Sequence, residues 1–187
     1  FATAFGKDIH EATVRRFWSN ERGLFIDNQP WLAEEKGPRL HDRTLATAVL
    51  FDLCSNGEQQ PAVNALATCP PEMGISYPAN AGWRLWALGK AGRADAILHD
   101  LRTRWAGMES VTLNNTLAED WQPSPDSGSQ WSHCPVVPLY VLYMNLMGLR
   151  PLVPGFGRCE IRPQLADLAG LDAVAHTVRG PIRFHSQ

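Results

Sequence analysis

Two adjacent carboxylates lie close to two tryptophans and a histidine in a polar, irregular stretch of this sequence. The stretch runs through residues 114–121 (NNTLAEDW) and continues to residues 131–133 (WSH), and an apolar helix is predicted directly after it, from Pro135 to Met147. A polar, aromatic loop anchored to a rigid helix is a common place for a ligand site. Carboxylates beside indoles suit sugars, because the carboxylate handles protons or hydroxyls and the indole stacks on the apolar face of the ring.

Glu119 is the first catalytic candidate in this stretch. Asp120 beside it and Trp121 after it supply like charge and apolar surface, which are the surroundings of a carboxyl that acts as a base near neutral pH. Asp120 suits the role of orienting the loop backbone better than that of transferring protons. Trp121 and Trp131 are candidate stacking platforms. The structural alternatives are a surface or N-cap carboxylate for Glu119 and loop or core anchoring for the two indoles.

Other residues can contribute to the same site. His133 can hydrogen-bond a ligand or cap the helix that follows it. Tyr77 and Trp83 begin a predicted helix, and helix N-termini in helical toroids face the mouth of the cavity, so either side chain can line a site. Core packing remains the expectation for Trp83, and helix capping is the expectation for His41.

Helical periodicity recurs along the first 150 residues. The predicted helices span residues 8–18, 39–54, 59–68, 77–90, 93–108 and 135–147. Asp8 is the expected N-cap of the first helix, and Trp86 and Trp105 are expected in the core because they occur at helical spacing. Short turns join the helices roughly every 15 to 25 residues, a rhythm typical of antiparallel helical hairpins in a bundle, solenoid or toroid.

The pattern changes after Gly148, where prolines and glycines interrupt the helices. Strands are predicted at residues 159–163, 172–178 and 181–185, with a hairpin turn at Arg179 and Gly180. Three short strands cannot close a sheet with two covered faces. The β part is therefore expected to be truncated, or to pair with strands outside this chain.

Composition excludes several classes of function. The 187 residues are 44% hydrophobic with a net charge of −2, so the chain is globular and carries no basic stripe for nucleic acid. No apolar run reaches the roughly 20 residues of a membrane span. The six histidines and four cysteines (Cys54, Cys69, Cys134 and Cys159) lack metal-ligand spacing, and the cysteines are expected as reduced thiols at packing positions. Motifs for nucleotide binding and nucleophilic acyl transfer are also missing.

The order of these motifs resembles the C-terminal part of bacterial α-L-rhamnosidases of glycoside hydrolase family 78. Residues 116–121 (TLAEDW) resemble the family's TT-x-W-E-x-W segment, and residues 129–133 (SQWSH) resemble its S-L-N-H segment. Residues 153–156 (VPGF) and 161–163 (IRP) resemble the P-G-F…I-x-P passage, and residues 76–108 resemble the helical hairpin before the catalytic loop. Ala118 and Ser132 replace the family's Trp and Asn. These replacements are expected to affect which sugar is bound more than which class of reaction is catalysed.

The resemblance implies a mainly α fold, with part of an (α/α)6 barrel followed by a few strands of a truncated β-sandwich. Residues 1–150 would form the C-terminal half of the catalytic barrel, and residues 151–187 would begin the β-sandwich domain. The sequence begins at Phe1, with no initiator methionine and no signal peptide, which indicates a piece of a longer bacterial protein, cytoplasmic or exported.

The resemblance also implies the chemistry. The family hydrolyses terminal α-L-rhamnosides with inversion, and Glu119 matches its general base, which activates water. The sugar site would be lined by Trp121, His133, Trp131, Tyr77 and Asp120. No metal or organic cofactor is needed, and the partners would be a rhamnose-containing oligosaccharide or glycoside and the rest of the parent polypeptide.

One catalytic group of the family has no match in this sequence. The general acid of the family lies in a D-x-P-x-R-x-E segment, and an inverting site needs two carboxyls roughly 6.5–9.5 Å apart. The acid is therefore expected outside this chain, and the fragment alone is expected to be inactive. The alternative function is a non-catalytic carbohydrate-binding or scaffold helical domain. A third, a helical repeat that binds proteins, predicts an apolar groove and no affinity for sugars.

Overall fold

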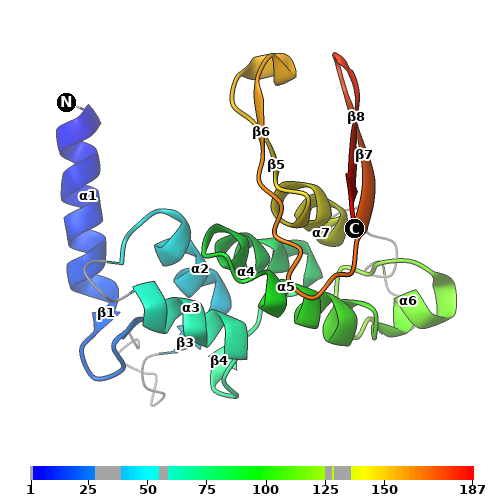
Figure 1. Cartoon of the computed structure of the whole chain (residues 1–187). Helices are drawn as coiled ribbons and strands as arrows, with labels where there is room; N and C mark the ends of the chain where they lie inside the picture. Colours follow the sequence, from blue (N-terminus) through cyan, green and yellow to red (C-terminus); the bar gives the residue numbers. More distant parts are fainter. Residues whose placement is uncertain (1, 28–38, 55–58, 125–127, 129–135) are drawn as a thin grey trace. The chain divides into compact units, whose positions relative to one another are not determined.

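The computed structural model describes residues 2–27, 39–54, 59–124, 128 and 136–187 (Figure 1). Helices dominate and the strands are short, as the sequence predicts. The chain divides into two compact units, residues 1–76 and residues 77–187. In the described part, no helix is long and apolar enough to cross a membrane.

The described residues of the first unit form three helices and short strand pairs. Its elements are α1 (Ala2–Phe17), β1 (Trp18–Ser19), β2 (Leu24–Phe25), β3 (Leu40–His41), α2 (Asp42–Leu50), α3 (Gln59–Thr68) and β4 (Met73–Gly74). Strands β1 and β2 pair antiparallel, and β3 and β4 pair parallel. The prediction of Asp8 as a helix N-cap was wrong, because α1 begins at Ala2 and Asp8 lies within it. The alanines before Asp8 are strong helix formers and extend the helix towards the N-terminus.

Helix α2 is shorter than the predicted span of residues 39–54. It starts later because Leu40 and His41 belong to the β3 ladder, and it ends before Asp52, whose φ of 54° is not helical. His41 is the N-cap, and its Nδ1 accepts a hydrogen bond of 3.2 Å from the backbone N–H of Arg43. The expectation that His41 caps this helix is therefore confirmed.

A buried carboxylate fixes the start of α2. Asp42 is fully buried, and its oxygens accept hydrogen bonds from the backbone N–H of Ser76 at 3.1 and 3.0 Å and from Ser76 Oγ at 2.7 Å. These bonds satisfy the buried charge and tie the segment after β4 to the first turn of α2. Leu45 and Val49 of α2 and Leu66 of α3 form the adjoining apolar core.

The second unit contains a helical hairpin, further short helices and two strand pairs. Its elements are α4 (Pro78–Lys90), α5 (Ala94–Asp100), the π-helical turn η1 (Leu101–Trp105), α6 (Glu109–Asn114), α7 (Val137–Val141), the π-helical turn η3 (Leu142–Leu146), β5 (Leu149–Pro151), the 3-10 turn η4 (Pro154–Phe156), β6 (Cys159–Ile161), β7 (Leu171–Thr177) and β8 (Gly180–Ser186). The predicted hairpin is confirmed by the antiparallel pair β7–β8, with its turn at Val178 and Arg179 rather than at Arg179 and Gly180. Strands β5 and β6 form a separate antiparallel pair.

The α4–α5 hairpin holds the core of this unit. The turn between the helices contains Gly92 with a φ of 75°, and Leu85, Leu88 and Ile97 are fully buried. Trp105 is also buried, as predicted. The prediction of a core position for Trp86 was wrong, since it is 38% exposed.

Trp86 lies off the buried stripe of α4, which follows Ala81, Leu85 and Leu88. Its ring instead forms a surface cluster with Trp83, at a centroid distance of 6.1 Å, and with Tyr140, at 6.0 Å. Trp83 was expected to pack in the core. It is half-buried, and its ring belongs to this surface cluster.

Candidate active-site loop

The loop that carries Glu119 begins where α6 ends. Asn115 adopts a left-handed conformation with φ 54° and ψ 34°, and its N–H contacts the carbonyls of Ser110 and Val111. The N–H of Thr116 also donates to the carbonyl of Ser110, at 3.1 Å. Asparagine is one of the few residues that enters this region at low cost, so it ends the helix and satisfies the carbonyls of the last turn.

Burial decreases along the loop from Ala118 to Asp120. Ala118 is fully buried, Glu119 is half-buried and Asp120 is exposed. The buried methyl group of Ala118 anchors the middle of the loop, which leaves the two carboxylates facing more open surroundings. A tryptophan at position 118 would have to open the interior, because the methyl group already fills an enclosed site.

Trp121 fastens the end of the loop to the helical hairpin. Its ring meets Trp105 edge to face, with centroids 5.1 Å apart and an interplanar angle of 75°. The guanidinium carbon of Arg104 lies 5.4 Å from the centroid of the Trp121 ring, in the range of a cation–π contact. The anchoring role weighed for Trp121 is thus present in the structure. Its indole is half-buried, and part of its surface remains accessible.

A buried polar network holds Trp105, the partner of Trp121, in place. Nε1 of Trp105 donates a hydrogen bond of 3.2 Å to Asp100 Oδ2, and Asp100 Oδ1 forms an ion pair with Nη2 of Arg84. Arg84 is 3% exposed and Asp100 is 4% exposed. We call Arg84, Asp100 and Trp105 the buried network, and it connects α4 through the second helix of the hairpin to Trp121.

Sequence reasoning missed Arg84 and Asp100. A signal was present, because Arg84 interrupts the apolar stripe of α4 directly before Leu85. An arginine at a core position requires a buried partner. Asp100 also has Arg104 four residues later, with Arg104 Nε 3.7 Å from Asp100 Oδ1.

Tyr77 lies at the N-terminal end of the same hairpin. It is the residue before α4, followed by Pro78 at the first helical position, and it is 44% exposed. The two helices run antiparallel and Arg84 meets Asp100, so Trp105 is expected level with the first turn of α4. Tyr77 therefore belongs to the end of the hairpin where Trp121 is attached. Trp131 and His133 lie outside the described residues.

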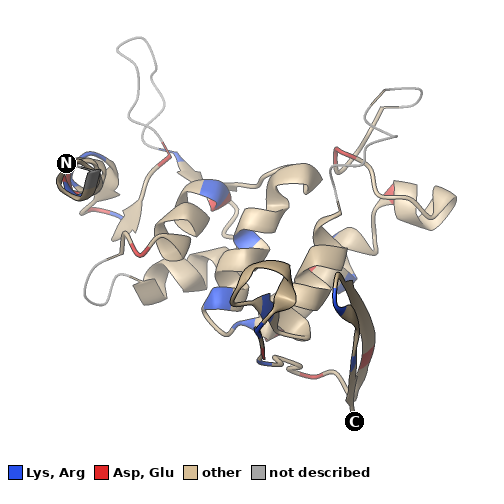
Figure 2. Cartoon of the chain, turned by 90° about the horizontal axis from the view of Figure 1, so that it is seen from above, with Lys and Arg blue, Asp and Glu red and all other residues tan. Residues whose placement is uncertain are grey.

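Figure 2 shows Lys and Arg residues at several separate places along the described ribbon, with Asp and Glu residues between them. Within the same part of the chain, no group of three or more His, Cys, Asp or Glu side chains could hold a metal ion. Two half-buried cysteines, Cys69 and Cys159, are thiols rather than disulfides, and Cys69 Sγ donates to the carbonyl of Leu66 at 3.5 Å. Cys134 is not among the described residues.

No protein-family model matches this chain, and no curated protein matches its sequence. In three dimensions the chain is similar to the crystal structure of a GH78 family rhamnosidase of Bacillus sp. GL1, with a TM-score of 0.78 and 23% sequence identity over 94% of this chain. The match spans 19% of the rhamnosidase. The chain thus has the fold of a segment of that protein, and the resemblance predicted from its motifs is confirmed at the level of structure.

Proposed function

We propose that this chain is a segment of an inverting glycoside hydrolase that cleaves terminal α-L-rhamnosides, with Glu119 as the general base. The observation that carries the proposal is the structural likeness to a GH78 family rhamnosidase over 94% of this chain. The TLAEDW sequence at residues 116–121 supports it independently, because it places a glutamate where that family has its base. In this proposal, residues 1–150 form the C-terminal half of an (α/α)6 barrel, and residues 151–187 begin a β-sandwich.

The proposed chemistry assigns one proton transfer to this chain. The Glu119 carboxylate takes a proton from water as the water oxygen attacks the anomeric carbon, and the leaving-group oxygen takes a proton from a general acid outside this chain. Such a base must be held at a fixed position. Buried Ala118 before it and anchored Trp121 after it restrain the backbone of Glu119 on both sides.

The remaining loop residues supply proposed contacts to the sugar. Asp120 is exposed and can accept hydrogen bonds from hydroxyl groups. Trp121 packs one part of its indole against Trp105. In this proposal, the sugar ring stacks on the part of the indole that remains accessible. Tyr77, Trp131 and His133 complete the proposed sugar site.

The proposal is tested with the full-length protein and a set of aryl glycosides that share one aglycone and differ in the sugar. We expect hydrolysis of the α-L-rhamnoside, with β-L-rhamnose as the first product in the proton NMR spectrum. Hydrolysis of another glycoside alone would refute the substrate, and α-L-rhamnose as the first product would refute the inverting mechanism. Saturable rhamnose binding without hydrolysis would instead favour the non-catalytic carbohydrate-binding alternative.

A further inference from the structure

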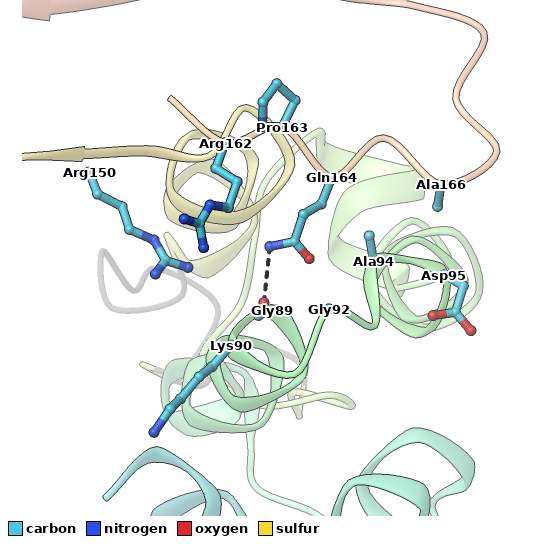
Figure 3. A pocket seen from close by; sticks show the side chains of 10 residues that line it. All are labelled: Gly89, Lys90, Gly92, Ala94, Asp95, Arg150, Arg162, Pro163, Gln164 and Ala166. Atoms are coloured by element: carbon cyan, nitrogen blue, oxygen red, sulfur yellow. Dashed lines mark hydrogen bonds between the residues drawn. The ribbon is translucent and has the colours of Figure 1, made fainter. Parts of the chain in front are cut away.

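A hollow of about 640 Å³ lies where α4 turns into α5 (Figure 3). Gly89 and Gly92 of this turn line one side, and Arg150, Arg162 and Gln164 line the other. The hollow is at the C-terminal end of α4, whereas Tyr77 precedes its N-terminal end. A helix of this length separates its two ends by roughly 20 Å. None of its lining residues belongs to residues 114–121, so the hollow is distinct from the loop that carries Glu119.

The lining of the hollow is positively charged. Lys90, Arg150 and Arg162 contribute three cations. The lining carboxylate of Asp95 is already engaged, because Arg93 donates to its oxygens from Nε at 2.9 Å and from Nη2 at 2.8 Å. Figure 3 shows the guanidinium groups of Arg150 and Arg162 on the same side of the hollow, while Asp95 lies at the opposite side. The positive charge is consequently concentrated at one end.

Part of the Arg162 guanidinium has a protein partner. Its Nη2 lies 3.0 Å from Glu160 Oε1, and the Arg162 side chain is 75% exposed. An arginine fork has five N–H donors, so one ion pair leaves further donors for an oxyanion. Arg150 lies on β5 directly opposite Glu160 of β6, and Arg162 directly follows β6, so the two arginines lie close to the same strand pair.

Backbone hydrogen bonds fix the wall that carries these side chains. The N–H of Arg162 donates to the carbonyl of Gly148 at 3.1 Å, and the N–H of Gln164 donates to the carbonyl of Leu146 at 2.9 Å. The approach at Gly148 is close, since a Cβ atom there would lie 1.8 Å from the oxygen of Arg162. A wall that is already ordered loses little entropy when a ligand binds.

The side chain of Gln164 joins this wall to the helical hairpin. Its Nε2 donates to the carbonyl of Gly89 at 3.0 Å. Its Oε1 is enclosed and has no hydrogen-bond partner among the described residues. A buried acceptor is normally satisfied, whereas this one has no donor among the described residues and faces the interior of the wall.

We propose that this hollow binds the oxyanion of a small molecule, either a carboxylate or a phosphate. Arginine forks match the geometry of carboxylate and phosphate oxygens, and Lys90 adds a further positive charge. The proposal does not depend on Glu119 or on rhamnoside hydrolysis, because the hollow lies at the other end of α4.

NMR titration of the ¹⁵N-labelled chain tests the proposal. The probes are galacturonate for the carboxylate and inorganic phosphate for the phosphate, with neutral rhamnose as the control sugar. We expect saturable shifts of the Gly89 and Gly92 amide signals with an anionic probe and none with rhamnose. The anion that binds more tightly identifies which of the two oxyanions the hollow prefers.

Variants show whether the arginines are responsible. Arg150→Ala and Arg162→Ala should each weaken anion binding by about tenfold, which is typical for the loss of a charge-assisted hydrogen bond. Arg150→Lys keeps the charge without the fork and should give an intermediate affinity even if the alanine variant folds poorly. Arg183→Ala is the matched control, because Arg183 is an exposed residue of β8 outside the hollow. The absence of saturable shifts at the two glycines, or an equal loss in Arg183→Ala, would overturn the proposal.

Discussion

Trp105 and Trp121 meet edge to face at a centroid distance of 5.1 Å, and this contact joins the buried hairpin to the loop that carries Glu119. Trp105 is 2% exposed and donates a hydrogen bond to Asp100, so its ring is held from within the core. Trp121 is half-buried and lies two residues after Glu119. The position of the proposed base therefore depends on an aromatic contact whose rigid half belongs to the fold.

Replacing Trp121 tests how much its aromatic ring contributes to stability. Trp121→Ala loses the contacts with Trp105 and with Arg104, and we expect the free energy of unfolding to fall by about 1–3 kcal/mol. Trp121→Phe keeps a ring at the same place and should lose less than half as much. Urea denaturation of the variants measures this difference. Equal losses in the two variants would show that the aromatic contact contributes little to stability.

Removing the charge of Asp100 should be much more damaging. In Asp100→Asn the buried guanidinium of Arg84 loses its counter-charge, and we expect a loss of about 3–5 kcal/mol in the free energy of unfolding. The control is Asp167→Asn, which breaks the Arg102–Asp167 pair, whose side chains are 52% and 66% exposed. Exposed pairs are screened by water, so this variant should unfold almost like the original chain. Similar stability of the two variants would contradict the account of the buried network.

Gly89 is predicted to tolerate no side chain. A Cβ atom there would lie 1.7 Å from Nδ2 of Asn145, which is fully buried. Gly89→Ala should therefore destabilise the chain by about 1–3 kcal/mol through overpacking. The second substitution Asn145→Ala should recover part of this loss in a double-mutant cycle. Gly6→Ala in α1, where nothing lies within 4 Å of the added Cβ, should be neutral or slightly stabilising.

Tyr140 is expected to make the stability of the chain depend on pH in alkaline solution. Burial raises the pKa of its phenol above the ordinary value of about 10, and the positive charge of Arg150 partly offsets the shift. The folded chain thus holds this proton more tightly than the unfolded chain. Stability should fall as the pH rises through the unfolded pKa, and the fall should continue until the folded pKa is passed.

The measurement is an absorbance titration of tyrosinate in the original chain and in Tyr140→Phe. The signal that disappears in the variant should titrate above pH 10. The variant should also lose less stability between neutral and alkaline pH than the original chain. A missing signal that titrates at or below pH 10 would show that burial does not control this phenol.

Two helices were predicted nearly to their ends, whereas the bounds of α1 and α2 and several short elements were not. The helix predicted at residues 59–68 has the observed bounds, and the helix predicted at residues 77–90 differs only in that Tyr77 precedes it. Helix α6 was missed because it has six residues, and only Ser110 among them is buried. The three-residue strand β5 was also missed.

The site was predictable only in part for a different reason. The TLAEDW pattern at residues 116–121 is local, so a sequence can show it directly. The contact between Trp105 and Trp121 depends on how the chain returns to the hairpin, and residue types alone cannot choose between stacking on a sugar and packing on another indole. The hollow could not be predicted from the sequence either, because its lining brings together Gly89 and Arg162, which are far apart in the chain.

The most direct test of the central claim compares Glu119→Gln with the original full-length protein on an aryl α-L-rhamnoside. Loss of a general base should lower kcat by about 10²–10⁴-fold, while the affinity for rhamnose stays within a few-fold. Asp120→Asn is the matched control, because this neighbouring carboxylate is exposed and is assigned to sugar contact. It should affect KM more than kcat. Turnover by Glu119→Gln equal to that of the original protein would remove Glu119 from the mechanism.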